Sequence, residues 1–190
     1  MSAPDDDLVA GLRARDPAAF ARTYARYHDA IFRFLLRLSE RRALAEDLFQ
    51  ETWLAVARDA PRLAEDSDLR AWLYAVARNR FRTHRRWSML DLTRLFELAR
   101  EALHETPSHE AEVGARAEAR RASIAFGRLK TTEKEVLLLA VGEGLEGPAL
   151  GKALGISAEA ARQRLHRARA ALTAATAQHE VAMKKREQEP

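Results

Sequence analysis

The stretch LGISAEAARQRLHRAR, residues 154–169, predicts a tight turn followed by a basic helix. Gly155 suits the turn, and Ser157 is a good N-cap for the helix after it. Arginines spread over most faces of this helix, and its apolar stripe consists of Ala161, Leu165, Ala168 and Leu172. A short helix, a glycine turn and a capped, arginine-bearing second helix are typical of a helix-turn-helix. A solvated basic helix that closes a bundle is the alternative.

The composition indicates a soluble protein that stays in the cytoplasm. Of the 190 residues 47% are hydrophobic and 32% are charged, and no apolar run approaches the roughly 20 residues that span a bilayer. The N-terminus, residues 1–7, is acidic and lacks the basic and then apolar layout of a signal peptide. Cysteine is absent, which excludes disulfides, thiolate nucleophiles and cysteine metal sites.

The positive charge is concentrated in two segments. The net charge is only +4, but residues 70–86 contain six arginines and no acid. Residues 157–169 contain four arginines against a single glutamate, and the stretch between the two segments, residues 97–118, is rich in acids. This distribution predicts polyanion binding at two places.

Helical periodicity covers nearly the whole chain. In the first half it predicts helices over about residues 6–15, 16–38, 43–58 and 68–86, with a polar loop at 62–67. In the second half Thr132 and Glu135 fit a capping box before an apolar helix. Residues 142–147 end that helix, and Pro148 can open the first helix of the helix-turn-helix. Residues 104–116 lack an apolar period and predict a linker.

The sequence therefore predicts an all-α protein of two small helical domains joined by a flexible acidic linker, the second domain containing the helix-turn-helix. We place the domains at residues 6–87 and 121–175, the linker at 88–120 and a charged tail at 176–190. The end of the tail, residues 184–190, is expected to be disordered.

Catalytic signals are weak. The six histidines are scattered without the spacing of a zinc site, and the sequence has neither a Gly-x-Ser-x-Gly motif nor a phosphate-binding glycine loop. We therefore expect neither an enzyme nor a cofactor or metal.

The segment AEDLFQETWL, residues 45–54, predicts a helix with two faces. Leu48, Phe49 and Thr52 can face a core. The helix also carries polar and large side chains that cannot all be buried beside these three. They are Asp47, Gln50, Glu51 and either Trp53 or Leu54. An exposed aromatic residue beside acids would suit docking to a basic partner, although an ordinary surface helix fits the composition equally well.

The segment LRAWLYAVARNRFRTHRR, residues 69–86, interleaves arginines with aromatic residues. Arginines can bind phosphates and aromatic faces can stack on unpaired bases, so single-stranded DNA is a suitable ligand. Core packing is the alternative role for Trp72 and Phe81, and a solvated face is the alternative for the arginines.

Together, these segments resemble the extracytoplasmic-function sigma factors of bacterial RNA polymerase, the two-domain members of the sigma-70 family. Residues 45–52 resemble the polymerase-core-binding motif of that family, and residues 69–79 resemble its promoter-melting helix. Residues 135–139, 154–156 and 164–169 resemble its minus-35-reading domain.

The resemblance implies a role in promoter-specific initiation, with core RNA polymerase, promoter DNA and an anti-sigma factor as partners. The residues it implies for core binding are Asp47, Leu48, Gln50, Glu51 and Trp53. Those implied for the minus-10 element are Arg70, Trp72, Arg78, Asn79, Arg82, Arg85 and Arg86. Those implied for the minus-35 element are Ser157, Arg162, Gln163, Arg164, His166, Arg167 and Arg169. The loop up to Asp68 would capture a flipped base, and the linker would lie in the polymerase's basic channel.

Two stretches depart from the family pattern. Residues 147–151, GPALG, stand where a Tyr-Glu-Glu-Ile-Ala-like run is usual, and glycine and proline lower helix propensity. Ala160 and Ala161 stand where a Thr-Val pair is common.

Two other functions are kept as alternatives. One is a stand-alone helix-turn-helix regulator that acts as a dimer, and the other is a helical protein whose basic faces bind an acidic partner protein.

Overall fold

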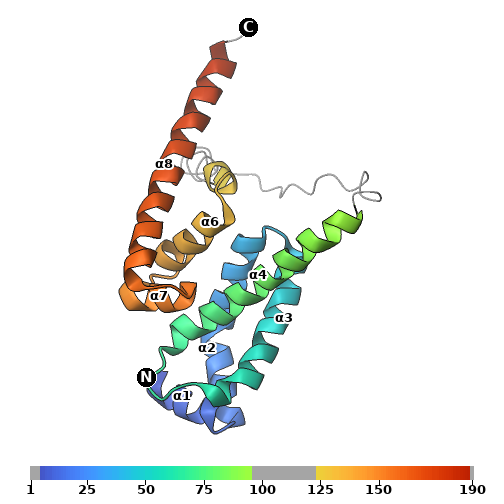
Figure 1. Ribbon diagram of the computed structural model, residues 1–190, viewed down its shortest axis with the longest axis vertical. Helices are drawn as coiled ribbons and strands as arrows, with labels where there is room; N and C mark the ends of the chain where they lie inside the picture. The colour runs from blue at the N-terminus through green and yellow to red at the C-terminus, as the bar shows by residue number, and fades with distance from the viewer. Residues whose placement is uncertain (1–4, 96–122, 189–190) are drawn as a thin grey trace.

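The computed structural model describes residues 5–95 and 123–188, and every regular element in those ranges is helical (Figure 1). The all-α prediction is confirmed. The first domain contains α1 (Asp5–Arg13), α2 (Pro17–Ser39), α3 (Arg42–Asp59), the short 3₁₀-helix η1 (Ala60–Arg62) and α4 (Leu69–Leu95). The second contains a short helix at 123–127, α6 (Thr131–Leu137), the π-helical turn η2 (Leu138–Gly142), α7 (Gly147–Leu154) and α8 (Ala158–Gln188).

Helix α2 is the central support of the first domain. Asp16 caps it by accepting hydrogen bonds from the amides of Ala18 and Ala19, and Pro17 fills the first helical position, as the sequence predicts. Its inner face is buried against α1, α3 and α4. The Tyr27 hydroxyl donates to the Asp5 carboxylate at 2.9 Å, which ties α1 to α2. Burial, and then this hydrogen bond, raise the pKa of Tyr27 to about 12.

The helix-turn-helix prediction is confirmed in the second domain. Helix α7 ends at Leu154, and the next residue, Gly155, caps it in the left-handed conformation at φ 64°. The Ser157 hydroxyl then accepts a hydrogen bond from the Ala160 amide at 3.1 Å, so Ser157 caps α8. The stripe predicted for α8 faces inward: Ala161 and Ala168 are fully buried, and the two leucines of the stripe are partly buried.

Gly151 explains part of the unusual run at residues 147–151. Its position faces the start of α8, and a Cβ there would lie 2.9 Å from the Ile156 carbonyl oxygen and 3.1 Å from the Ala158 amide nitrogen. Real side chains do not approach backbone atoms so closely. A glycine at this position therefore lets α7 and α8 meet at the tight turn.

The two domains pack directly against each other. Helix α4 lies against α7, and α2 lies against η2 and α6, so the buried apolar side chains form one continuous core (Figure 1). The sequence predicted two cores and a linker, but it contained no indication of this contact.

Three local predictions differ from the structure. Helix α6 begins at Thr131, where the Glu133 carboxylate accepts from the Lys130 amide at 2.8 Å, so the capping box predicted for Thr132 and Glu135 is wrong. Helix α4 continues past Arg86 to Leu95. The tail expected to be disordered from residue 184 is helical as far as Gln188. The linker predicted at 104–116 lies outside the described residues.

Candidate polymerase- and DNA-binding surfaces

An acidic face lies on the exposed side of α3. Asp47, Gln50 and Glu51 are all exposed there, one to four positions apart along the helix. Leu54 continues this face and is 72% exposed. The four residues together are called the acidic α3 face below. A large apolar side chain beside two carboxylates suits contact with a basic partner that also offers apolar surface.

The exposed aromatic residue expected on this face is absent, because Trp53 is only 6% exposed. Its ring packs against Phe20, Tyr24 and Phe49, with centroids 5.9, 4.8 and 6.1 Å away. Leu48 is also buried, at 1%. Trp53 thus holds α3 against α2, and Leu48 belongs to the buried core. The interpretation of Trp53 as an exposed docking residue is wrong. Contacts between aromatic rings stabilise the packing of α3 on α2 by more than the buried apolar area alone would.

A basic surface follows the second half of α4. Asn79, Arg82 and Arg86 are exposed, and Arg85 lies with its guanidinium 6.0 Å from the Phe81 ring centroid. Phe81 is buried and Trp72 is half-buried. A groove of about 510 Å³ separates this part of α4 from the start of α6 and is lined by Asn79, Arg82, Thr83, Arg85, Arg86, Thr131, Thr132 and Glu135. The exposed arginines can therefore bind phosphates, whereas Phe81 belongs to the core.

Arg78 does not belong to this exposed surface. Its side chain is 4% exposed, and its Nε donates to Glu135 Oε2 at 2.8 Å from the facing helix α6. The Glu135 side chain is itself 1% exposed. The expectation that Arg78 lies open to DNA is wrong in this conformation, since its guanidinium is buried in an ion pair between the two domains.

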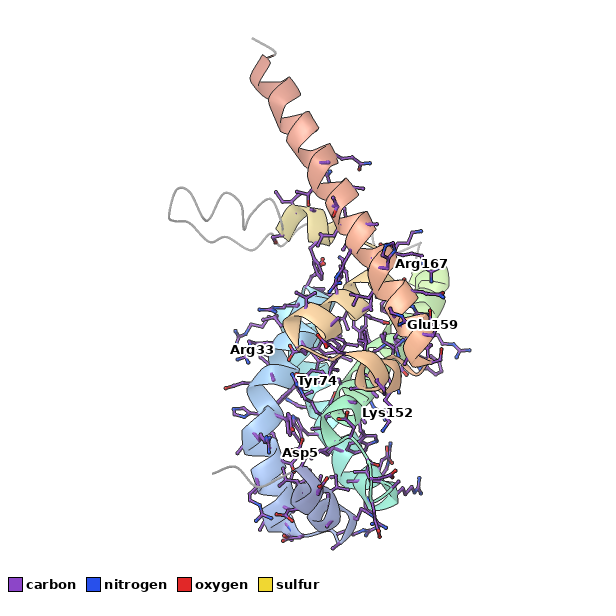
Figure 2. All side chains as sticks on the ribbon, turned by 90° about the vertical axis from the view of Figure 1, so that its left-hand side faces the viewer. Asp5, Arg33, Tyr74, Lys152, Glu159 and Arg167 are labelled. Atoms are coloured by element: carbon purple, nitrogen blue, oxygen red, sulfur yellow. The ribbon has the colours of Figure 1, made fainter. Side chains whose placement is uncertain are left out.

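A second polar contact joins the domains one turn earlier on α4. The Tyr74 hydroxyl donates to the Glu143 carboxylate, and the Arg70 guanidinium donates to the Glu143 carbonyl oxygen. Tyr74 lies where α4 meets the second domain (Figure 2). Burial and then the hydrogen bond to Glu143 raise the pKa of Tyr74 far above its usual range, so the hydroxyl stays protonated.

The sequence patterns did not predict that Glu135 and Glu143 bind residues of α4. Glu135 fitted a capping box by its spacing, and Glu143 lay in a predicted turn. The one signal for Glu135 is that a carboxylate directly precedes the apolar run at 136–139. Charged residues are seldom fully buried unless they are paired.

Helix α8 presents a basic, exposed face. Arg162, Gln163, His166, Arg167 and Arg169 are exposed, as is Ser157 at the cap, and Arg164 is half-buried. Glu159 forms an ion pair with Arg162 and accepts from Gln163 Nε2 at 3.0 Å. Arg167 lies further along the same helix (Figure 2). Six of the seven residues predicted for this surface are thus exposed on α8 or at its start.

Two further observations concern only the parts of the chain that the structure describes. Within residues 5–95 and 123–188, no three histidine, aspartate or glutamate side chains gather as a metal ion would require. Across those same ranges, none of the helices combines the length and apolar character that a membrane span needs.

Comparison with known proteins identifies both halves of the chain. The Sigma-70 region 2 model matches residues 23–88, and the Sigma-70 region 4 model matches residues 125–172. RNA polymerase sigma factor CarQ of Myxococcus xanthus is 32% identical over 158 residues, which cover 82% of this chain and 88% of CarQ. RNA polymerase sigma factor CnrH of Cupriavidus metallidurans is 29% identical over 187 residues, covering 92% of this chain and 96% of CnrH.

Two solved structures are similar to nearly the whole chain. CnrH in complex with the cytosolic domain of CnrY is 26% identical, has a TM-score of 0.64, and is matched over 90% of this chain and 95% of CnrH. The sigma factor RpoE of Bartonella quintana, in complex with the anti-sigma factor NepR, shares the fold at a TM-score of 0.67, with 21% identity over 82% of this chain and 95% of RpoE.

Proposed function

Because the chain belongs to the sigma-70 family, as an RNA polymerase sigma factor of the extracytoplasmic-function group, we propose that its surfaces divide the work of promoter-specific transcription initiation. It binds core RNA polymerase and directs that enzyme to promoters. The polymerase makes the RNA, and this chain contributes specificity rather than a catalytic group. It acts in the cytoplasm, beside the polymerase.

The acidic α3 face serves core binding in this proposal. Its two exposed carboxylates meet a basic surface of the polymerase, and Leu54 adds apolar contact where Trp53 cannot. Leu48 and Trp53 contribute by holding α3 in position. This division of roles follows from burial, since a side chain in the core cannot touch a partner.

The two basic surfaces serve DNA binding. On α4 the exposed residues Asn79, Arg82 and Arg86 bind the minus-10 region, with Arg85 beside them. On α8 the arginines enter the major groove at the minus-35 element, where arginine pairs bidentately with guanine. The observation that carries the proposal is that the acidic face and one basic surface lie in the region 2 match, and the other basic surface lies in the region 4 match.

An anti-sigma factor is the expected regulatory partner. The similar RpoE structure is a complex with the anti-sigma factor NepR, and the similar CnrH structure is a complex with the cytosolic domain of CnrY. A stand-alone regulator would use α7 and α8 alone and would leave the region 2 match, residues 23–88, without a role. We therefore do not favour that alternative.

Arg167→Ala is expected to lower transcription from promoters with an intact minus-35 element. Loss of one bidentate base contact costs about 1–3 kcal/mol, or roughly 5- to 150-fold. Run-off transcription with core polymerase across a genomic promoter library would identify the promoters and measure the change at fixed salt. Arg33→Ala, which removes an exposed arginine from α2, is the matched control and should leave transcription unchanged. Equal effects of the two variants would contradict base reading by α8.

A further inference from the structure

Helix α4 carries a large exposed apolar side chain directly after its basic surface. Trp87 is 63% exposed and follows Arg86, one residue before the end of the Sigma-70 region 2 match. The other two tryptophans of the chain, Trp53 and Trp72, pack on the core. Water opposes the exposure of so much apolar surface, so Trp87 suits a surface that a partner covers.

Trp87 is the last member of a stripe that begins at the start of α4. The stripe consists of side chains at steps of three or four residues, which lie on one face of a helix: Trp72, Val76, Asn79, Thr83 and Trp87. The first two are half-buried and the other three are exposed. Helix α4 is continuous over its whole length and extends past α3 at this end (Figure 1), so it presents the five side chains in a fixed line.

The charge around Trp87 indicates that the partner is nucleic acid. Arg82 and Arg86 are exposed beside the stripe, and residues 69–90 contain neither aspartate nor glutamate. A polyanion is attracted to such a segment, whereas a basic protein is repelled by it. Cations that hold phosphates next to an aromatic ring that contacts bases are the combination that binds DNA.

The position of Trp87 along α4 indicates paired rather than unpaired DNA. A helix rises 1.5 Å per residue, so Trp87 lies about 12 Å beyond Asn79, which corresponds to about three or four base pairs of duplex. The resemblance assigns the flipped base to the loop up to Asp68, at the opposite end of α4. Trp87 therefore lies toward the duplex between the minus-10 and minus-35 elements.

We propose, on the basis of the function proposed above, that Trp87 reads a base pair of this duplex, directly upstream of the minus-10 element, by packing its indole ring on a thymine methyl group. An α-helix fits the major groove, where thymine presents its methyl group beside the O4 acceptor. The indole offers an apolar face and one N–H donor, so it matches both features. The other three bases lack the methyl group. Trp87 thus adds a third sequence preference to those of the two promoter elements.

Trp87→Ala tests this reading on promoters whose base pairs directly upstream of the minus-10 element are randomised. With core polymerase, we expect the wild-type chain to favour thymine at one of these positions by about fourfold in run-off transcription, since the burial of one methyl group corresponds to about that factor. Trp87→Ala should lose this preference and keep its dependence on the minus-10 and minus-35 sequences. The side chain is exposed, so circular dichroism should show the variant to be as helical as wild type.

A chemical change in the DNA tests the contact with the methyl group itself. Deoxyuridine in place of the preferred thymidine removes only that methyl group, and we expect it to lower wild-type transcription about fourfold. The same replacement should leave transcription by Trp87→Ala unchanged, whereas Trp87→Phe, which keeps an aromatic face, should still respond to it. Val141→Ala removes exposed apolar surface from the second domain and should respond as wild type does.

The outcomes are distinguishable. Equal base preferences of the wild-type chain and Trp87→Ala would overturn the reading by Trp87 and leave the proposed function intact. A loss in Trp87→Ala that is the same on every upstream sequence would also overturn it, because such a loss indicates a contact with the DNA backbone or with a protein. Failure of the wild-type chain to start transcription with core polymerase at any promoter would overturn the proposed function, and the reading by Trp87 with it.

Discussion

Reversing the charge of the acidic α3 face, by Asp47→Arg with Glu51→Arg, is expected to abolish productive binding to core RNA polymerase. Both side chains are exposed, so we expect the substitutions to leave the fold intact. Placing like charges against a basic partner costs several kcal/mol, and about 3 kcal/mol already corresponds to roughly a 100-fold loss of affinity. Fluorescence anisotropy with labelled chain and purified core polymerase measures this loss, and run-off transcription should fall with it.

The matched control is Asp6→Arg with Asp7→Arg, which makes the same change of net charge at two exposed positions of α1. This variant should bind core polymerase within about twofold of wild type. Circular dichroism should show both variants to be equally helical. Unchanged core affinity in the α3 variant would contradict the role assigned to the acidic α3 face.

Gly151→Val is expected to disrupt the helix-turn-helix. The new side chain would meet the Ile156 carbonyl oxygen and the backbone of Ala158, and backbone atoms cannot turn aside as a flexible side chain can. Overpacking of this kind costs about 1–3 kcal/mol and lowers the melting temperature of a small domain by several degrees. Transcription that depends on a minus-35 element should be lost.

Gly127→Ala is the control for this substitution, because a Cβ at Gly127 would meet no atom within 4 Å and the residue lies in the same domain. Thermal melts followed by circular dichroism compare the two variants. If Gly151→Val melted at the same temperature as Gly127→Ala, the close approach of α7 and α8 would not restrict the size of the side chain at position 151.

The features that could be predicted from sequence are local ones. The Asp16 cap, the Gly155 turn and the Ser157 cap each depend on residues within four positions of one another. Apolar periodicity identified the inner faces of α2 and α8 for the same reason. These signals are sufficient for an all-α fold with a helix-turn-helix at its C-terminal end.

The burial of Arg78 could not be predicted, because it depends on a residue 57 positions away. The neighbouring residues indicate only that Arg78 is one of several cations on a helix. None of them indicates that a carboxylate from the other domain binds it. The same limit applies to Trp53, whose large ring fits either an exposed face or a core. Only the position of Phe20 and Tyr24 on α2 decides between them.

The helical tail has a simpler cause. Residues 158–189 contain neither glycine nor proline, so no residue strongly opposes the continuation of α8. The charged composition of residues 184–190 suggested disorder, but lysine, arginine, glutamate and glutamine are all good helix formers.

Promoter opening measured by permanganate reactivity tests the central claim most directly. With a promoter found in the run-off library, thymines of the minus-10 region should become reactive only when both this chain and core polymerase are present. The Asp47→Arg with Glu51→Arg variant should leave them unreactive. Tight binding of the chain alone to a palindromic site, with no opening when core polymerase is added, would contradict the account.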